Sequence, residues 1–567
     1  MDSKASLRLR RSAAQMHALT QLQREIRASD PHIRRKYLRD FSDAYRSYES
    51  VLSSDQLFTI YGGADVLLVG DYHALPASQR FAAALVRELA QQERPVVLGV
   101  ETIFARDQYL LDLWRQGRID AQELRAGIRY DQDWGYDWEP FFELLESARQ
   151  HAFSIYALDC KPRNDLRKIG ARDRHAANRI AEIRARHPDA RVVVLFGESH
   201  LAPKHLPELL RARRPQDRML TVLQNVDTLY WLAAGERHER VEAVRVAEDV
   251  VCVFNSTPLE KYESYRICLE RWREERESAP DYAPAFYNMV EALLRFLNIN
   301  RRSPRNGVQP VPLDLLQVHC RTSNDRLRRL LLHKGADQSE LNATLARIET
   351  QGTCYVPRTG AVFARNFQLV HGAEQAARFV HHICRGAKLD TEAAGAEERF
   401  YTRTMEEALA YFGSRALYPV RPAVRQSHLY ELYSMRRESV EELGICSYRE
   451  FMQLVDFLVL HKDYETNLRH YRRLPDLLRE GPSWGGERFD YATQQLGYML
   501  GSELYDAYIA GRIAKRFLRA LFFRNLDKPG AARIAYFATV KRLRKKMRSS
   551  QHSAISTQGS AKFLSQS

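Results

Sequence analysis

The sequence contains no long apolar run, although 45% of its 567 residues are hydrophobic. A membrane-spanning helix needs roughly 18 consecutive apolar residues, and no stretch of this chain approaches that length. The basic N-terminus is not followed by the apolar segment that a secretory signal requires. With 28% charged residues, the composition is typical of globular proteins and not of disordered chains. The sequence therefore predicts a cytoplasmic protein of several domains.

Cysteine is scarce and scattered. The seven cysteines occur singly, at positions 160, 252, 268, 320, 354, 384 and 446. No pair has the Cys-x-x-Cys spacing that zinc fingers and iron–sulfur clusters use. Dispersed thiols in odd number are typical of reduced, mostly buried cysteines in a cytosolic protein. Cysteine is therefore not expected to carry the chemistry.

Positive charge is in excess, but it is concentrated at the ends of the chain. The formal net charge is +15, and nine Lys or Arg residues with no Asp or Glu follow Asp527. The body of the chain is close to neutral, which argues against nucleic acid as a main partner. The Ser- and Gln-rich basic tail over residues 541–567 predicts disorder and contact with acidic partners or an anionic membrane surface.

Apolar runs with β-type composition alternate with helix-like segments in the first half of the chain. They are Val66–Val69, Val96–Val100, Phe153–Leu158 and Val192–Phe196, with a fifth run at Val250–Phe254. Such an alternation indicates a buried, mainly parallel sheet with helices on both faces. The predicted fold class is α/β.

Helical periodicity dominates the remainder of the chain. The first sixty residues predict a helical segment, and the strand pattern disappears after residue 271. The expected organisation is a helical segment over residues 1–60, an α/β domain over 61–270, a large all-α region over 271–540 and the basic tail.

The four predicted strands each run into polar residues. Gly70-Asp71-Tyr72-His73 follows the first strand, and Gly197-Glu198-Ser199-His200 follows the fourth. Glu101 ends the second strand and Asp159 the third. Ligands bind outside the carboxyl ends of the strands in open α/β sheets. We therefore expect one crevice with His73, Glu101, Asp159 and His200, and with Asp71 and Glu198 beside the imidazoles.

Three interpretations of these side chains remain open. Imidazole and carboxylate ligands suit zinc, manganese or iron, and a bound metal can lower the pKa of its water to about 7. Without a metal, one His can act as a general base that Asp71 or Glu198 orients, while the other donates a proton or stabilises an oxyanion. The third interpretation is that these are ordinary residues at strand ends.

The paired motifs, Glu101, the stretch Asp133-Trp134-Gly135-Tyr136-Asp137-Trp138 and Arg172-Asp173 resemble the ChaN-like domain. That domain belongs to the haem-binding-uptake, Tiki and erythromycin-esterase-like superfamily, and the resemblance covers about residues 60–270. It implies three activities: metal-dependent proteolysis in Tiki members, hydrolysis through an activated water in the esterase branch, and haem binding through a Tyr in ChaN lipoproteins.

By position, the resemblance assigns the chemistry to His73, Glu101 and His200, and it implies that Arg172 stabilises developing negative charge. The leading hypothesis is a bacterial, metal-dependent hydrolase of esterase or peptidase type, with a divalent metal at these two imidazoles and the carboxylate. The alternatives are a haem- or iron-binding protein without catalysis and a helical scaffold with a vestigial site. A small-molecule substrate, a peptide substrate and a dimeric state are all compatible with the sequence.

Overall fold

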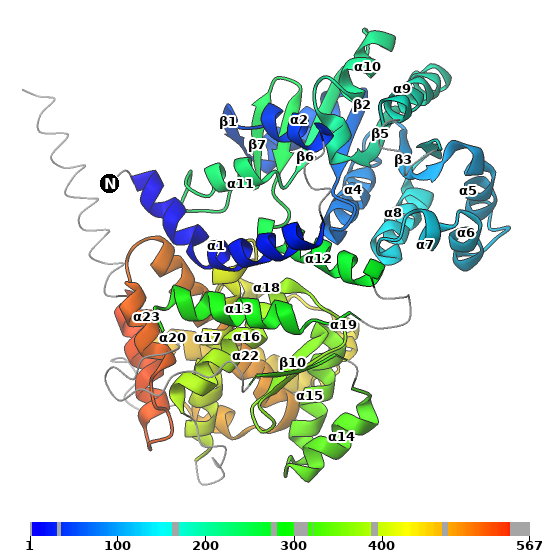
Figure 1. Ribbon diagram of the computed structural model, residues 1–567. Coiled ribbons are helices and arrows are strands. Elements are labelled where there is room, and N and C mark those ends of the chain that lie inside the picture. Colours follow the sequence, from blue (N-terminus) through cyan, green and yellow to red (C-terminus); the bar gives the residue numbers. More distant parts are fainter. Residues whose placement is uncertain are drawn as a thin grey trace, which may run out of the picture. The chain divides into compact units, whose positions relative to one another are not determined.

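The computed structural model describes residues 3–30, 36–161, 169–273, 280–299, 316–320, 322–386, 395–467 and 475–544. The chain divides into two compact units, and each is described here by itself (Figure 1). The first combines Met1–Ser12 with Leu19–Ser278, and the second combines Ala13–Ala18 with Ala279–Ser567. In the described ranges, no helix has the length and apolar character needed to cross a membrane.

The first unit is built on an eight-stranded sheet with the order β1-β7-β8-β6-β2-β5-β3-β4. The strands are β1 (Ser50–Leu52), β2 (Val66–Asp71), β3 (Val96–Phe104), β4 (Ser154–Asp159), β5 (Arg191–Gly197), β6 (Met219–Gln224), β7 (Ala243–Ala247) and β8 (Val250–Val253). The six strands from β8 to β4 are parallel to their neighbours. Only β7 and β1 pair antiparallel, at one edge. The predicted mainly parallel sheet is therefore confirmed.

Helices cover both faces of this sheet. α4 (Pro76–Leu89) packs against α8 (Trp138–His151), and α9 (Ile169–Arg186) packs against α10 (Leu206–Arg213). The chain reaches β3 and β4 through α4 and α8, and it returns to β5 and β6 through α9 and α10. Because parallel crossovers are right-handed, connections that run in opposite directions place their helices on opposite faces (Figure 1).

The first part of the chain contains further helices besides α4, α8, α9 and α10. They are α1 (Ser3–Ser29), α2 (Lys36–Ala44), α3 (Ser54–Gly63), α5 (Gln108–Arg115), α6 (Ala121–Gly127), α7 (Tyr130–Asp133), α11 (Asp227–Ala233), α12 (Pro258–Arg273) and the 3₁₀ turns η2 (Ala105–Asp107) and η4 (Glu198–Leu201). β1 interrupts the helical segment that the sequence predicts over residues 1–60.

The central strands are apolar throughout because helices bury both of their faces. Every residue of β2, β3 and β5 is buried. The core cluster joins alternate residues of these strands, such as Leu67, Leu98 and Val193, to Leu85 of α4 and Leu144 of α8. This two-sided burial explains why the continuous apolar runs mark these strands in the sequence.

The direction of the connections changes between β2 and β5. These two strands are neighbours, and Asp71 pairs in register with Gly197 at their ends. The helices that follow them leave toward opposite faces, and open α/β sheets bind their ligands at such a point. β3 lies next to β5 and β4 lies next to β3. The ladder between β3 and β4 is irregular between Val100 and Phe104, the stretch that contains Glu101.

The second unit is mainly helical but also contains a small sheet. β9 (Gln317–His319), β10 (Thr353–Val356) and β11 (Ala361–Ala364) pair in the order β10-β11-β9. The expectation of an all-α region after residue 271 is therefore wrong for this stretch. Each strand has only three or four residues, so the periodicity of the flanking helices masks the strand pattern in the sequence.

From Leu369 onward the described residues form helices, as the sequence predicts. The helices of this unit are α13 (Ala283–Phe296), α14 (Asn324–His333), α15 (Gln338–Gln351), α16 (Leu369–Arg385), α17 (Ala396–Leu417), α18 (His428–Tyr433), α19 (Arg437–Leu443), α20 (Tyr448–Thr466), α21 (Asp476–Glu480), α22 (Gly486–Ile509), α23 (Lys515–Phe522) and the 3₁₀ turn η6 (Gly481–Ser483). A further helix covers residues 531–544. It includes residues 541–544 of the predicted tail, while residues 545–567 lie outside the described residues.

Two glycines allow α22 to pack closely against α17. A Cβ atom on Gly497 would lie 2.4 Å from the Cβ of Glu407, and one on Gly501 would lie 2.5 Å from the backbone oxygen of Ala408. Both distances are far shorter than a normal van der Waals contact. The helices therefore meet backbone to backbone at these positions.

We expect Gly497→Ala to destabilise the second unit by about 1–3 kcal/mol, because the added methyl group overpacks this contact. Helix propensity alone would favour alanine by about 1 kcal/mol, so the sign of the effect reports on packing. The matched control is Gly485→Ala at the start of α22, where a Cβ atom meets nothing within 4 Å. Thermal unfolding followed by circular dichroism measures both variants. An unchanged or higher Tm for Gly497→Ala would contradict the predicted close packing.

Candidate functional site

Two imidazoles face one carboxylate at the carboxyl edge of the first sheet. His73 follows β2, His200 lies in η4 after β5, and Glu101 lies on β3. His73 Nε2 is 3.9 Å from Glu101 Oε2, and His200 Nε2 is 3.8 Å from Glu101 Oε1. The structure thus brings together the three residues that the sequence places at this site.

An aspartate holds each imidazole through its other ring nitrogen. His73 Nδ1 is 2.8 Å from Asp71 Oδ2, and His200 Nδ1 is 2.5 Å from Asp173 Oδ1. An ionised carboxylate can only accept hydrogen bonds, so each Nδ1–H donates to its aspartate. In the neutral imidazole the lone pair is then on Nε2, the nitrogen nearer to Glu101.

Glu101 is buried, and its two oxygens accept different hydrogen bonds. Arg172 Nη2 donates to Oε1 at 2.5 Å, and the backbone N–H of Gly197 donates to Oε2 at 2.6 Å. Arg172 also donates to both oxygens of Asp159, through Nε at 2.8 Å and Nη2 at 3.0 Å. The guanidinium group is therefore held between two carboxylates, where it anchors Glu101.

The surrounding charges keep Glu101 ionised. Burial raises the pKa of this carboxyl group, but Arg172, the two imidazoles and the N–H of Gly197 together have the larger effect. The net result lowers its pKa to about 2. The imidazoles therefore face a fixed negative charge throughout the neutral range.

The missing side chain of Gly197 leaves space between these groups. A Cβ atom on Gly197 would lie 3.1 Å from both Glu101 Oε2 and His73 Nε2, and 3.3 Å from His200 Cδ2. The φ angle of Gly197 is −49°, so the backbone does not require glycine here. A side chain at position 197 would therefore crowd both imidazoles and the carboxylate.

The acids of the two Gly-acid-x-His motifs have different partners. Asp71 binds His73, whereas Glu198 accepts hydrogen bonds from Lys261 of α12 at 3.0 and 3.1 Å. Burial raises the pKa of Glu198. For Lys261, burial lowers the pKa, but the charge of Glu198 outweighs this effect and raises it. Glu198 therefore forms a buried ion pair and orients neither imidazole.

His73 is the accessible member of the site. Its side chain is 22% exposed, compared with 3% for Glu101 and 5% for His200. The rings of Trp134 and Tyr136 lie 4.5 and 5.4 Å from the His73 ring, measured between centroids. The aromatic stretch of the sequence thus lines the side from which His73 is reached.

The residues present do not fit the predicted divalent metal at His73, Glu101 and His200. In the described parts of the chain, no group of three or more His, Cys, Asp and Glu side chains could hold a metal ion. Both oxygens of Glu101 already accept short hydrogen bonds, one of them from the Arg172 guanidinium.

Three tyrosines lie around the site. Tyr37, Tyr72 and Tyr136 contact His200, Lys261 and His73, respectively. Burial raises the pKa of all three phenols. All three phenols are therefore protonated at neutral pH in the absence of a ligand.

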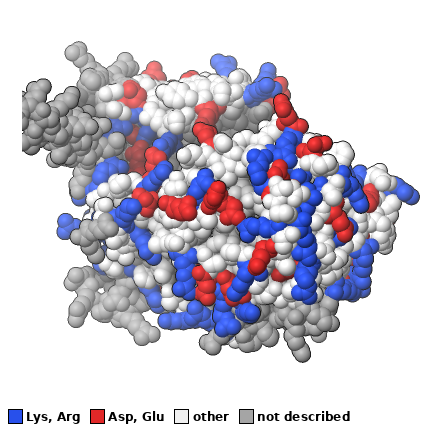
Figure 2. Space-filling view, turned by 90° about the horizontal axis from the view of Figure 1, so that it is seen from above, with Lys and Arg blue, Asp and Glu red and all other residues white. Residues whose placement is uncertain are grey.

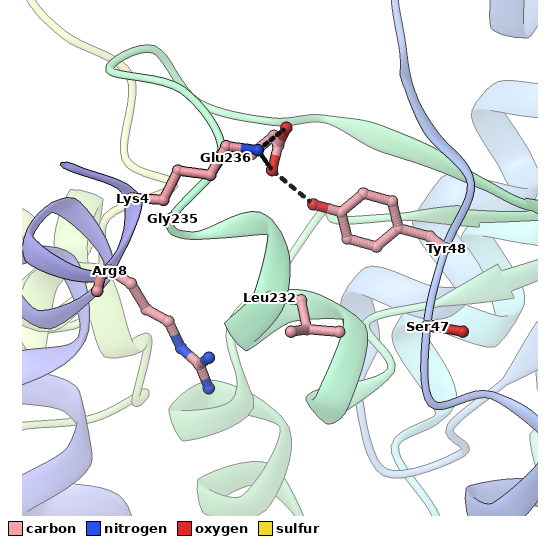
Figure 3. Close-up of a pocket in the computed structure, with 8 residues that line it drawn as sticks. Lys4, Arg8, Ser47, Tyr48, Leu232, Gly235 and Glu236 are labelled. Carbon is pink, nitrogen blue, oxygen red and sulfur yellow. Dashed lines mark hydrogen bonds and ion pairs between the residues drawn. The ribbon is translucent and has the colours of Figure 1, made fainter. Parts of the chain in front are cut away.

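A separate pocket of about 380 Å³ lies elsewhere in the first unit (Figure 3). It is lined by Lys4, Ala5, Arg8, Ser47, Tyr48, Leu232, Gly235 and Glu236. Lys4 Nζ and Tyr48 OH both donate to Glu236, at 2.9 and 3.2 Å. None of the residues expected to be catalytic lines this pocket.

Basic and acidic side chains lie interspersed on the face of the molecule in Figure 2.

Reasoning from the sequence missed three contributors to the site. Asp173 is adjacent to Arg172 in the motif that carries the family resemblance, so that motif could have indicated it. Lys261 and Tyr37 are distant in the sequence from their partners. Tyr37 of α2, for example, is 136 positions from Asp173, to which it donates a hydrogen bond, and no local pattern marks such a contact.

The comparison with family models supports a ChaN-like domain in part of the first unit. Residues 58–174 match the family model described as "Haem-binding uptake, Tiki superfamily, ChaN". One solved structure, "Cofacial heme binding to ChaN of Campylobacter jejuni", is 16% identical and has a TM-score of 0.25. The match covers 31% of this chain and 86% of that chain. No curated protein matches the sequence. The predicted resemblance is confirmed by the family model, whose match ends before the second motif.

We expect Glu101→Gln to lower the stability of the first unit by about 3 kcal/mol at neutral pH, because it leaves buried Arg172 with one carboxylate fewer. The pKa of Glu101 is lowered in the folded state, so its contribution is present above its ordinary value of 4.5 and is lost as the pH falls toward 2. The difference in Tm between the two proteins should therefore shrink over that range. The exposed Glu88 offers a control, since Glu88→Gln should leave the Tm unchanged. A Tm difference that is constant from pH 7 to pH 2 would contradict the lowered pKa.

Proposed function

We propose that the first unit is a hydrolase that activates water between His73, Glu101 and His200 without a metal. The observation that carries this proposal is the arrangement of two imidazoles, each held at Nδ1 by an aspartate, with both Nε2 atoms toward one ionised carboxylate. An imidazole oriented by a carboxylate is the arrangement that general acid–base catalysis uses.

The roles follow from the position of each group. A water molecule in the space beside Gly197 attacks the carbonyl carbon of an ester or amide, and His73 Nε2 accepts its proton. Asp71 stabilises the imidazolium that forms. The protonated form of His200 donates a proton from Nε2 to the leaving oxygen or nitrogen as its bond to the carbonyl carbon breaks. The proton held on His73 then restores His200 through solvent.

Glu101 and Arg172 act as the fixed part of the site. Glu101 is ionised and held at both oxygens, so its charge stabilises the positive imidazoles during proton transfer without moving. The sequence resemblance implies that Arg172 stabilises negative charge on the substrate. Since its Nε and Nη2 atoms bind Asp159 and Glu101, we assign it to anchoring Glu101 instead.

The substrate approaches from the side of His73. This imidazole is the most exposed group of the site, and the rings of Trp134 and Tyr136 flank it. Aromatic rings favour contact with an apolar or flat group of the substrate. An ester or a peptide with such a group next to the scissile bond matches this surface.

The main alternative is a haem-binding protein without catalysis. The observation that favours it is the match of residues 58–174 to a haem-binding family. A helical scaffold with an inactive site is the remaining alternative.

Gly197→Ala should abolish hydrolysis while the protein stays folded. The added methyl group occupies the space between the imidazoles and the carboxylate, so it displaces the attacking water. We expect kcat to fall by about 100-fold or more, comparable to the loss of acid–base catalysis. The assay uses a panel of p-nitrophenyl esters and peptide p-nitroanilides with the full chain.

The matched control is Gly70→Ala in the first motif, where a Cβ atom would meet only Leu201 and Glu198, at ordinary distances of 3.4 and 3.5 Å. Its kcat should stay within a few-fold of the unaltered protein. Equal activity of Gly197→Ala and Gly70→Ala would contradict the proposed position of the water. No turnover of any substrate, combined with a strong visible absorption band on titration with hemin, would favour the haem-binding alternative.

A further inference from the structure

We propose that Tyr37 is a positioning residue of this site, which fixes Asp173 and, through it, the imidazole of His200. The inference rests on the proposed hydrolytic function and extends the site to a helix outside the region that matches the family model. Tyr37 lies on α2, which packs against η4, the turn that carries His200.

The hydrogen bonds place Tyr37 one step behind the imidazole. The Tyr37 hydroxyl donates to Asp173 Oδ2 at 2.9 Å, while Asp173 Oδ1 binds His200 Nδ1. Asp173 is only 1% exposed, so water does not substitute freely for either partner. With a partner on each oxygen, the carboxylate cannot rotate without breaking a hydrogen bond.

The two halves of the site are built in the same way. Asp71 binds His73 through Oδ2, and its Oδ1 accepts a hydrogen bond from the Gln79 amide at 2.6 Å. Each orienting aspartate therefore has one oxygen on an imidazole and the other on a neutral donor. Tyr37 is the counterpart of Gln79, and this correspondence is the strongest reason to assign it to the site.

Ring contacts hold the Tyr37 side chain in place. Its ring stacks on His205 with centroids 3.8 Å apart and planes 7° apart, and it meets the edge of His200 at 5.6 Å. His205 Nε2 in turn lies 3.2 Å from Asp40 Oδ2, one turn further along α2. A phenylalanine at position 37 keeps these ring contacts and removes only the hydroxyl group.

The hydroxyl group remains a donor at neutral pH. Burial raises the pKa of Tyr37, and the negative charge of Asp173 raises it further. A neutral hydroxyl beside the carboxylate can orient it without neutralising its charge. The charge of Asp173 therefore stays available to the His200 imidazole.

The test compares Tyr37→Phe with Tyr48→Phe in the full chain. Tyr48 also belongs to the N-terminal segment and donates to a carboxylate, Glu236 at 3.2 Å, but this bond lies in the separate pocket (Figure 3). For Tyr37→Phe we expect a loss in kcat of about 10-fold, in the range of one hydrogen bond to a charged group. KM should change by less than two-fold, and Tyr48→Phe should change neither constant.

A spectroscopic readout tests the positioning without a substrate. The ¹⁵N chemical shifts of the His200 ring, measured at one fixed pH in histidine-labelled protein, report which nitrogen carries the proton. Tyr37→Phe should move the His200 ring signals and leave those of His73 in place, because the acceptor of the His200 Nδ1–H is no longer fixed. Unchanged His200 signals together with an unchanged kcat would overturn the proposal.

The two proposals fail in different ways. If the unaltered protein hydrolyses nothing, the hydrolase proposal fails, while a shift of the His200 signals in Tyr37→Phe still supports the positioning role. If Tyr37→Phe does not fold, 3-fluorotyrosine at position 37 keeps the ring and the hydroxyl group but makes the hydroxyl a stronger donor. It should then move the His200 signals and not those of His73; unmoved His200 signals would overturn the positioning role.

Discussion

The ionised carboxylate of Glu101, buried between a guanidinium group and two imidazoles, is the interaction on which the rest of the site depends. Burial by itself favours the neutral carboxyl group, and Arg172 together with the N–H of Gly197 reverses that preference. Asp159 completes the anchor, because it holds Arg172 from the end of the neighbouring strand. Both imidazoles can then face one negative charge whose position is fixed by the sheet.

The topology of the sheet explains how this charge meets two imidazoles. Strands β2 and β5 are neighbours whose following helices leave toward opposite faces, so the residues after both strands meet at one edge of the sheet. Each strand is followed by a Gly-acid-x-His motif, but the two motifs differ in their details. In the first motif the acid binds its own histidine, whereas in the second the glycine provides space and the acid pairs with Lys261.

The sequence predicts the parts of this structure that local patterns encode. Continuous apolar runs marked the central strands because both of their faces are buried, and polar residues after these runs marked His73, Glu101 and His200. Glu101 itself does not end its strand, because β3 continues to Phe104. The strands β9 to β11 are too short to produce such a pattern. Contacts such as Tyr37 with Asp173 span more than a hundred positions, so no local spacing reveals them.

The predicted metal site shows a different limit of the sequence. The sequence shows which residues have side chains that could bind a metal. It does not show that Arg172 already donates a hydrogen bond to Glu101, because that contact forms only in the folded chain.

The cytoplasmic location, the domain boundaries, the dimeric state and the partners of the basic tail stay predictions. The part of the tail over residues 545–567 lies outside the described residues.

The central claim is that His73 and His200 act together on one water molecule, and a double-mutant cycle tests it most directly. The hydrolysis rate is measured for His73→Ala, His200→Ala and the double variant with the same chromogenic ester. Residues that act as a unit are strongly non-additive, so the double variant should be about as slow as the slower single variant. Losses that simply multiply would show two independent groups and would contradict a shared site.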